Sequence, residues 1–335
     1  MNRVSLLLSH LPRQISGSDE PIKRLKAAIA FLRTQDVTII TSSGQTNWDC
    51  ILAAALWGGI PVHLVLVAPT TVLDVSEQFN CEFNSYGVVD SCELRDKYIC
   101  SAADCLYPIW LRRNGRISRI ISDLPAHIDL SFDCSFYRFR ESGLKYILSG
   151  ISVEAGLLPS DYLWHWTRGR HDAWQGETQR NYCNDILNSE SPPRNALATL
   201  IRILSERKIR ASGLRIAGNI PVTSFTANHP AKSAAMFTWR TDWQRMNFEP
   251  YGIGIEKKYA AAKGAKLLNY GTTPDWDTMQ YKNRWKNENE WRIKGDLLLD
   301  DEIINKIIVV VRKQTEIKKI KNIFNGKIIA YEKET

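Results

Sequence analysis

Short, largely apolar runs alternate with amphipathic stretches over the first 150 residues. A run that is apolar at nearly every position is typical of a strand buried on both faces, and a 3.6-residue repeat is typical of a helix. The predicted strands are Val37–Ile40, Ile60–Val67 and Cys105–Leu111, and the predicted helices are Glu20–Leu32, Asp49–Trp57 and Glu93–Ala102. Strand, helix and strand within about 30 residues form a βαβ unit. We therefore expect an α/β domain with a doubly wound parallel sheet.

The pattern changes between Gly150 and Asp161, where Gly156 and Pro159 indicate a linker. Beyond it, polar and apolar positions alternate in short strand-like runs, which predicts an α+β domain. Its other predicted elements are a helix near Arg194–Arg207, closing strands at Ile303–Val311 and Ile328–Tyr331, and a basic helix at Lys313–Lys321. The expected domains are residues 1–152 and 153–335.

Composition and charge narrow the range of partners. The chain has 335 residues, 44% hydrophobic and 24% charged, with a net charge of +8. No apolar run approaches the roughly 20 residues that span a bilayer, and the N-terminal run is too short for a signal peptide, so we expect no membrane association. The positive charge, concentrated in Lys306–Lys333, favours an anionic partner, with nucleic acid the first candidate. The alternative is a solvated lysine-rich surface.

The cysteine pattern indicates a reducing compartment. The seven cysteines form no C-x-x-C pair, and none lies near a histidine at zinc-binding spacing. We expect free thiols, a cytoplasmic location and no metal.

The loop from Thr41 to Thr46 lies between a predicted strand and the helix that follows it. Ligands of doubly wound sheets bind at the carboxyl ends of strands, and helix N-termini favour phosphate. Ser42, Ser43 and Gly44 are therefore candidate nucleotide-binding residues. The alternative is a ligand-free turn, capped by Thr46 and Asp49.

With these motifs, the first domain resembles the SLOG-type Rossmann-like domains, which include LOG-type and DprA-type proteins. The resemblance rests on Ile40-Thr41-Ser42-Ser43-Gly44, Gly59-Ile60-Pro61-Val62 and Arg95-Asp96 with the Ala103–Ile109 segment. It implies nucleotide or nucleic-acid binding at the first βα loop. The Gly-Gly-x-Gly-Thr signature of LOG enzymes is absent, which favours binding or sensing over hydrolysis.

Four runs in the second half carry polar residues that a core would not select: Tyr162–Thr167, Val222–Phe225, Tyr251–Ile255 and Glu288–Arg292. If these strands share one sheet, we expect His165, Thr167, Ser224, Tyr251 and Glu290 to converge on one cleft. Glu288 and Glu290 are two residues apart, so a strand would present both on one face.

In these residues the second domain resembles compact ADP-ribosyltransferase-like domains of bacteria that carry Glu-x-Glu-Trp-Arg, and more distantly DarT-type enzymes. The resemblance implies NAD as cosubstrate. It implies that His165 and Thr167 hold the ribose, that Ser224, Phe225 and Tyr251 form the second element, and that Glu290 supports positive charge developing on the ribose. His165, Tyr251 and Glu290 are the expected catalytic residues, and Thr167, Ser224 and Phe225 are expected to bind the cofactor.

These observations favour an NAD-dependent ADP-ribosyltransferase that acts on nucleic acid or protein in bacterial defence or as a toxin. One alternative is a nucleic-acid processing enzyme whose cleft holds an extruded base. Another is a non-catalytic nucleotide sensor, in which His165 belongs to the core and Glu290 forms a structural ion pair with Arg284 or Arg292. The aromatic and basic segment Trp239–Arg245 would close over a cofactor, contact a nucleic-acid strand or pack in the core.

Overall fold

The computed structural model divides the chain into two compact units. The first comprises residues 1–140 and 171–193, and the second residues 141–170 and 194–335. The structure describes residues 2–11, 15–138, 148, 150–214, 216–240, 245–271, 275–280 and 286–334. None of the described helices is long and apolar enough to cross a membrane.

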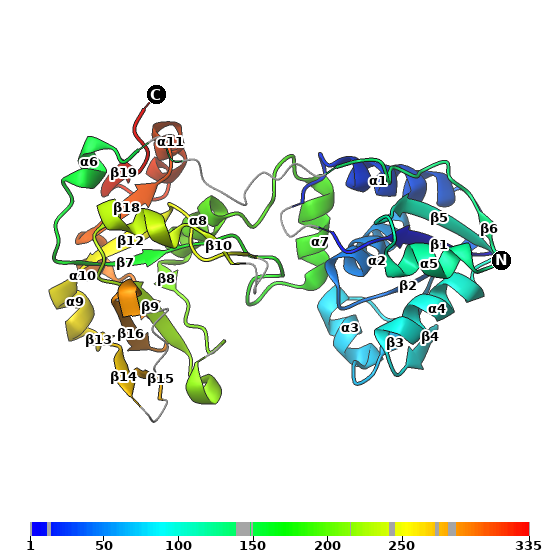
Figure 1. Cartoon of the computed structure of the whole chain (residues 1–335), viewed down its shortest axis with the longest axis horizontal. Coiled ribbons are helices and arrows are strands. Elements are labelled where there is room, and N and C mark those ends of the chain that lie inside the picture. Colours follow the sequence, from blue (N-terminus) through cyan, green and yellow to red (C-terminus); the bar gives the residue numbers. More distant parts are fainter. Residues whose placement is uncertain are drawn as a thin grey trace. The chain divides into compact units, whose positions relative to one another are not determined.

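A parallel sheet forms the centre of the first unit (Figure 1). Its strands are β1 (Asn2–Leu8), β2 (Val37–Ser42), β3 (Val62–Val67), β4 (Tyr86–Val89), β5 (Cys105–Trp110) and β6 (His127–Ile128). They lie in the order β4-β3-β2-β1-β5-β6. The chain therefore builds outward from β1 to β4, then crosses back to the other side of β1. This doubly wound parallel sheet confirms the predicted class and is compatible with a Rossmann-like fold.

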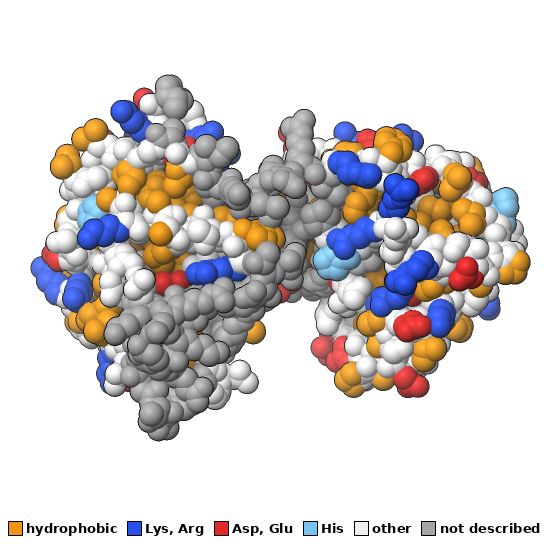
Figure 2. Space-filling model, viewed as in Figure 1, with side chains coloured by type: hydrophobic (Ala, Val, Ile, Leu, Met, Phe, Trp, Pro, Cys, Tyr) orange, Lys and Arg blue, Asp and Glu red, His pale blue; other side chains and the backbone are white. Residues whose placement is uncertain are grey.

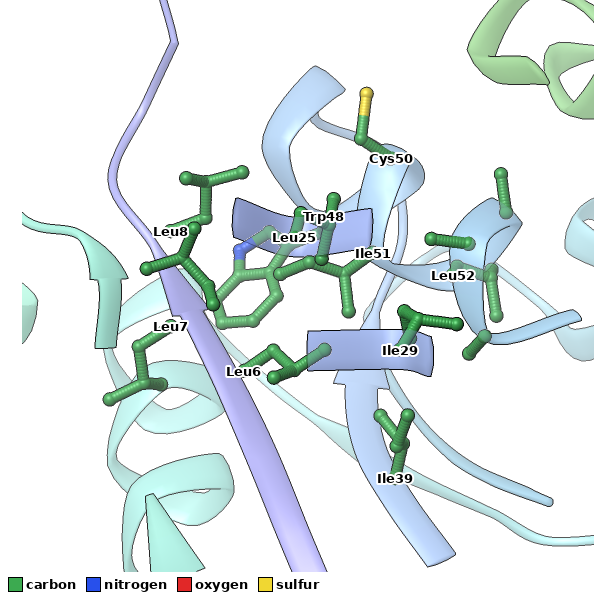
Figure 3. Close-up of a cluster of buried hydrophobic side chains, with 14 of the residues drawn as sticks. Leu6, Leu7, Leu8, Leu25, Ile29, Ile39, Trp48, Cys50, Ile51 and Leu52 are labelled. Carbon is green, nitrogen blue, oxygen red and sulfur yellow. The ribbon is translucent and has the colours of Figure 1, made fainter. Parts of the chain in front are cut away.

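Central strand β1 was not predicted from the sequence. Its Leu6, Leu7 and Leu8 are fully buried, as a central parallel strand requires. Figure 3 shows side chains from β1, α1, β2 and α2 around one apolar centre, with the indole of Trp48 beside Leu8 and Leu25.

Helices connect successive strands of this sheet. They are α1 (Glu20–Leu32), α2 (Thr46–Gly58), α3 (Val72–Phe79), α4 (Cys92–Ala102) and α5 (Arg116–Ser122). Right-handed crossovers place α1 to α3 on one face and α4 and α5 on the other, because the direction of winding reverses after β4. Helix α2 already begins at Thr46, so Asp49 lies inside the helix rather than at its start.

One excursion of the chain completes the first unit. Residues 171–193 leave the second unit and return to it, and they carry α7 (Gln179–Asn188), which packs against α2 and α3. Its Tyr182, Cys183, Ile186 and Leu187 are buried in the first unit's core. The expected boundary at 152/153 places residues 171–193 in the second domain, whereas in the structure they belong to the first unit.

The second unit contains a mixed sheet of seven strands in the order β13-β16-β9-β7-β12-β18-β19. They are β7 (Tyr162–Trp166), β9 (Val222–Thr226), β12 (Gly252–Glu256), β13 (Lys266–Leu267), β16 (Glu290–Lys294), β18 (Ile307–Val311) and β19 (Lys327–Ala330). All neighbours are antiparallel except β18 and β19. All four sequence runs with unusual polar residues therefore lie in neighbouring strands.

Shorter elements surround this sheet. The helices are α6 (Val153–Gly156), α8 (Ala196–Glu206), α9 (Lys257–Ala262), α10 (Asp301–Ile304) and α11 (Ile317–Lys321), with 3-10 turns η1 (Ala217–Asn219), η2 (Pro230–Met236), η4 (Lys286–Glu288) and η5 (Gln314–Glu316). The small strands are β8 (Lys208–Ile209), β10 (Trp239–Arg240), β11 (Arg245–Met246), β14 (Asn269–Gly271), β15 (Thr278–Gln280) and β17 (Leu297–Leu298). The strand predicted from Ile303 was wrong at its start, where Ile303 and Ile304 belong to α10.

Candidate functional site

Ser224 and Glu290 lie on one face of the second sheet. Ser224 pairs directly with Arg292, and Glu290 pairs with Thr226, so all four side chains point to the same side. Trp164 pairs with Thr226 on the neighbouring strand and shares this face. Since the face also carries the Trp164 and Trp166 core cluster, the polar residues lie at the edge of an aromatic layer.

The expected convergence on one cleft was wrong, because strand alternation divides the residues. His165 neighbours Trp164 and therefore points to the opposite face, where its ring meets that of Phe225 edge-on with centroids 5.8 Å apart. Tyr251 also belongs to the core on that side. On the face that carries Glu290, Ser224 is the predicted residue that meets it, whereas His165, Phe225 and Tyr251 lie on the opposite face.

His165 nevertheless contacts the same strand from the other side. Its Nδ1 lies 2.9 Å from the carbonyl oxygen of Ser224. A carbonyl can only accept, so Nδ1 carries the proton. Strands β7 and β9 pair only at Trp164 and Thr226. The carbonyl of Ser224 therefore lacks a main-chain N–H donor from β7, and the imidazole of His165 supplies the hydrogen bond in its place. Burial lowers the pKa of His165, and Arg168 adds to this effect.

Thr167 and Tyr251 have structural partners. The Thr167 hydroxyl lies 2.9 Å from the carbonyl oxygen of Ala196, the first residue of α8, and 3.1 Å from that of Tyr251. The Tyr251 hydroxyl donates to Glu316 across 2.9 Å. Burial raises the pKa of this phenol, and the Glu316 carboxylate adds to the rise. Both hydroxyls therefore tie strand ends to neighbouring segments.

The glycines of the Tyr251–Ile255 run are explained by two tryptophans. Gly252 pairs with Trp166 and Gly254 with Trp164. A Cβ on Gly252 would lie 2.7 Å from the Trp166 ring, and a Cβ on Gly254 would lie 2.5 Å from the Trp164 ring. The run therefore makes room for the stacked indoles, whose centroids are 5.8 Å apart.

Glu290 is held in a fixed orientation. Its Oε1 accepts from the Ser224 hydroxyl at 2.9 Å and from Arg292 Nε at 2.7 Å, while its Oε2 accepts from Arg292 Nη2 at 3.3 Å. Arg292 is only 3% exposed and also donates to the carbonyl of Trp276. The carboxylate thus forms a forked ion pair of well-defined geometry. Arg284, the other predicted partner, lies outside the described residues.

A second carboxylate, Glu288, lies beside Glu290, although not through strand alternation. Glu288 ends η4, and Asn289 between them has a φ of 45°, so the strand begins only at Glu290. The end of β9 fixes this turn, because the Thr226 hydroxyl donates to the carbonyl of Glu288 and Asn228 Nδ2 donates to that of Asn287.

Glu288 has an environment different from that of Glu290. It accepts a hydrogen bond from Asn247 at 3.3 Å and lies 3.5 Å from Arg240 Nη2. Burial raises the pKa of Glu288 to about 6; the Asn247 hydrogen bond lowers it, and the charge of Glu290 raises it further. Arg240 and Arg168 oppose this rise.

Sequence reasoning missed Asn247 and Arg240 as neighbours of this pair. Arg240 belongs to the aromatic and basic Trp239–Arg245 segment, whose ends form β10 and β11. Residues 241–244 of that segment lie outside the described residues.

In the first unit, the loop after β2 is already bound internally. The Ser42 hydroxyl donates to the carbonyl of Val65 at 2.6 Å, and the Gly44 N–H donates to Asp49 at 2.9 Å. Gly44 has a φ of 84° and open space around it, and Ser43 is partly exposed. Asp49 therefore accepts the hydrogen bond from the Gly44 N–H group that a phosphate would otherwise accept. The expected capping box of Thr46 and Asp49 is not formed.

Two buried polar atoms beside this loop lack partners. Within the described part of the chain, neither the Thr41 hydroxyl nor the Asn47 Oδ1 atom has a hydrogen bond. Asn47 Nδ2 donates to the carbonyl of Leu8 at the end of β1. Such atoms usually find a water or a ligand group.

No family model, curated protein or solved structure matches this chain.

Proposed function

We propose that the second unit transfers ADP-ribose from NAD, with chemistry centred on Glu288 and Glu290. The observation that carries the proposal is the pairing of two adjacent carboxylates in unlike environments. Glu290 is fixed by Ser224 and Arg292, whereas Glu288 has a pKa raised to about 6. Adjacent acidic groups with unlike environments are typical of sites that divide electrostatic and proton-transfer roles.

The residues divide the chemistry as follows. When NAD binds, its nicotinamide–ribose bond breaks, nicotinamide leaves with the bonding electrons, and positive charge develops on the ribose. Glu290 places negative charge beside that sugar. Glu288 takes the proton from the acceptor that attacks the ribose. Arg240, 3.5 Å from Glu288, would bind the pyrophosphate, to which a guanidinium is well matched.

Nicotinamide release from NAD by the purified chain tests this proposal. Glu290→Gln should lower turnover about a hundredfold or more, with little change in KM. Glu288→Gln should remove the rise of activity with pH near 6. Glu302→Gln, an exposed residue of α10, is the matched control. Turnover of E290Q equal to that of the control would end the proposal.

We also propose that the first unit binds a nucleotide at the ends of β1 and β2. The supporting observation is the pair of unpartnered buried atoms on Thr41 and Asn47. A nucleobase or ribose would satisfy them, whereas Asp49 disfavours phosphate on Gly44. Thermal shift with AMP, ADP and NAD should show stabilisation that Thr41→Val and Asn47→Leu both abolish. If the ligands stabilise the variants as much as the wild type, the two atoms bind only water and the proposal fails.

A further inference from the structure

Four exposed arginines lie at the end of β5 and along α5. Arg112, Arg113, Arg116 and Arg119 fall within eight residues that contain no acidic residue. Figure 2 shows Lys and Arg side chains across the face of the first unit where α4 and α5 lie. Arg112 is fixed to the end of β1, since its Nη2 donates to the carbonyl of His10 at 2.9 Å. The chain winds in opposite directions from β1 and β5, and such a switch point is where doubly wound sheets bind ligands.

An exposed aromatic ring accompanies these arginines. Phe136 is 74% exposed, although the loop that carries it is firmly attached to β5. Leu111 N–H donates to the Ser135 hydroxyl at 2.9 Å, and Trp110 Nε1 donates to the carbonyl of Tyr137 at 3.0 Å. The residues on both sides of Phe136 are thus held while its ring faces solvent. A ring presented in this way is preorganised for stacking.

The charge of this surface is only partly neutralised. Asp96 is 2% exposed and pairs with Arg95 and Arg116. Arg113 and Arg119 form no ion pair within the described part of the chain. Arg119 lies within α5, whereas Arg113 precedes that helix.

The geometry points to a binding surface for single-stranded nucleic acid, formed by Arg112, Arg113, Arg116, Arg119 and Phe136. The arginines contact successive phosphates, and an unstacked base lies on Phe136, the combination by which proteins bind single strands. A duplex keeps its bases stacked and would leave Phe136 unused. This inference concerns the first unit alone and does not depend on NAD chemistry in the second.

Fluorescence anisotropy with labelled oligo-dT of about 20 nucleotides, longer than typical single-strand sites, tests the proposal. The double variant Arg113→Glu/Arg119→Glu should weaken binding at least tenfold and flatten the salt dependence by roughly 1.4 in log–log slope, about 0.7 per lost phosphate contact. Phe136→Ala should weaken binding roughly 5- to 100-fold, and Phe136→Trp should retain it.

The matched control is Arg3→Glu/Arg33→Glu, which changes the net charge equally at the amino end of the sheet, on two exposed arginines. This control should bind nearly as the wild type does. Equal losses in both double variants, or wild-type affinity in F136A, would overturn the proposal. Tighter binding to phosphatidylserine vesicles through the same arginines would also overturn it, in favour of a lipid surface. Far-UV circular dichroism checks that each variant is folded.

Discussion

The imidazole of His165 donates to the main-chain carbonyl of Ser224, whose own hydroxyl donates to Glu290 on the opposite face of the sheet. One residue of β9 therefore links the half-buried His165 to the candidate carboxylate. His165 reaches the site only through the backbone of Ser224, so we assign it a positioning role in place of the ribose-binding role expected from the sequence.

Replacing His165 should destabilise the second unit. In His165→Ala the Ser224 carbonyl loses its donor, which should cost about 1–3 kcal/mol in free energy of unfolding. His165→Phe fills the space without a donor and should lose nearly as much. Urea unfolding at pH 7.5 measures both. Wild-type stability of H165F would mean that ring packing alone matters.

Lowering the pH should also reduce the free energy of unfolding through His165. Burial lowers the pKa of His165 below its ordinary value of 6.5, so the unfolded chain binds its proton first as the pH falls. The free energy of unfolding is then lost as the pH drops below about 6.5. H165F cannot be protonated, so its deficit relative to the wild type should shrink between pH 7 and pH 5. A deficit that is constant with pH would contradict this.

The Glu290–Arg292 pair should show strong coupling. Arg292→Met leaves a largely buried carboxylate without its partner, and such single removals cost about 3–5 kcal/mol. The double variant Arg292→Met/Glu290→Gln removes both charges and should recover part of that loss. Unfolding free energies of the wild type, both single variants and the double variant give the coupling energy. Additive losses would show that the pair contributes no net interaction.

Sequence patterns predicted single strands better than they predicted which distant segments of the chain pack together. The buried strands β2, β3 and β5 follow from local apolar runs, so they were found directly. The separation of His165 from Glu290 depends on the register of β7 against β9, and residues some 60 positions apart set that register. The return of α7 to the first unit also depends on distant contacts. Glu288 meets Glu290 through a turn at Asn289, which a regular alternation does not anticipate.

Gly254 should tolerate no side chain. An added Cβ would lie 2.5 Å from the Trp164 ring, which is itself fully buried. Gly254→Ala should therefore lower the free energy of unfolding by about 1–3 kcal/mol, the usual range for overpacking. Gly156→Ala in α6 is the matched control, since nothing lies within 4 Å of its added Cβ. Equal melting temperatures for the two variants would show that the indoles adjust freely.

Asp49 should make the stability of the first unit depend on pH. Burial raises its pKa from 3.8 to about 7, while hydrogen bonds from Gly44 and Gln179 and the charge of Arg95 act against the rise. Between about pH 4 and pH 7 the folded chain therefore holds a proton that the unfolded chain releases, and the free energy of unfolding falls as the pH rises through this window.

Asp49→Asn keeps the shape of the side chain and stays neutral at every pH. Its stability relative to the wild type should increase from pH 5 to pH 8 by at most about 3 kcal/mol, because this range covers roughly two pH units of the shift. Urea unfolding of both chains at pH 5, 6.5 and 8 measures the difference. A difference that does not change with pH would mean that Asp49 remains charged in the fold throughout, held by Arg95 and the Gly44 amide more strongly than burial opposes it.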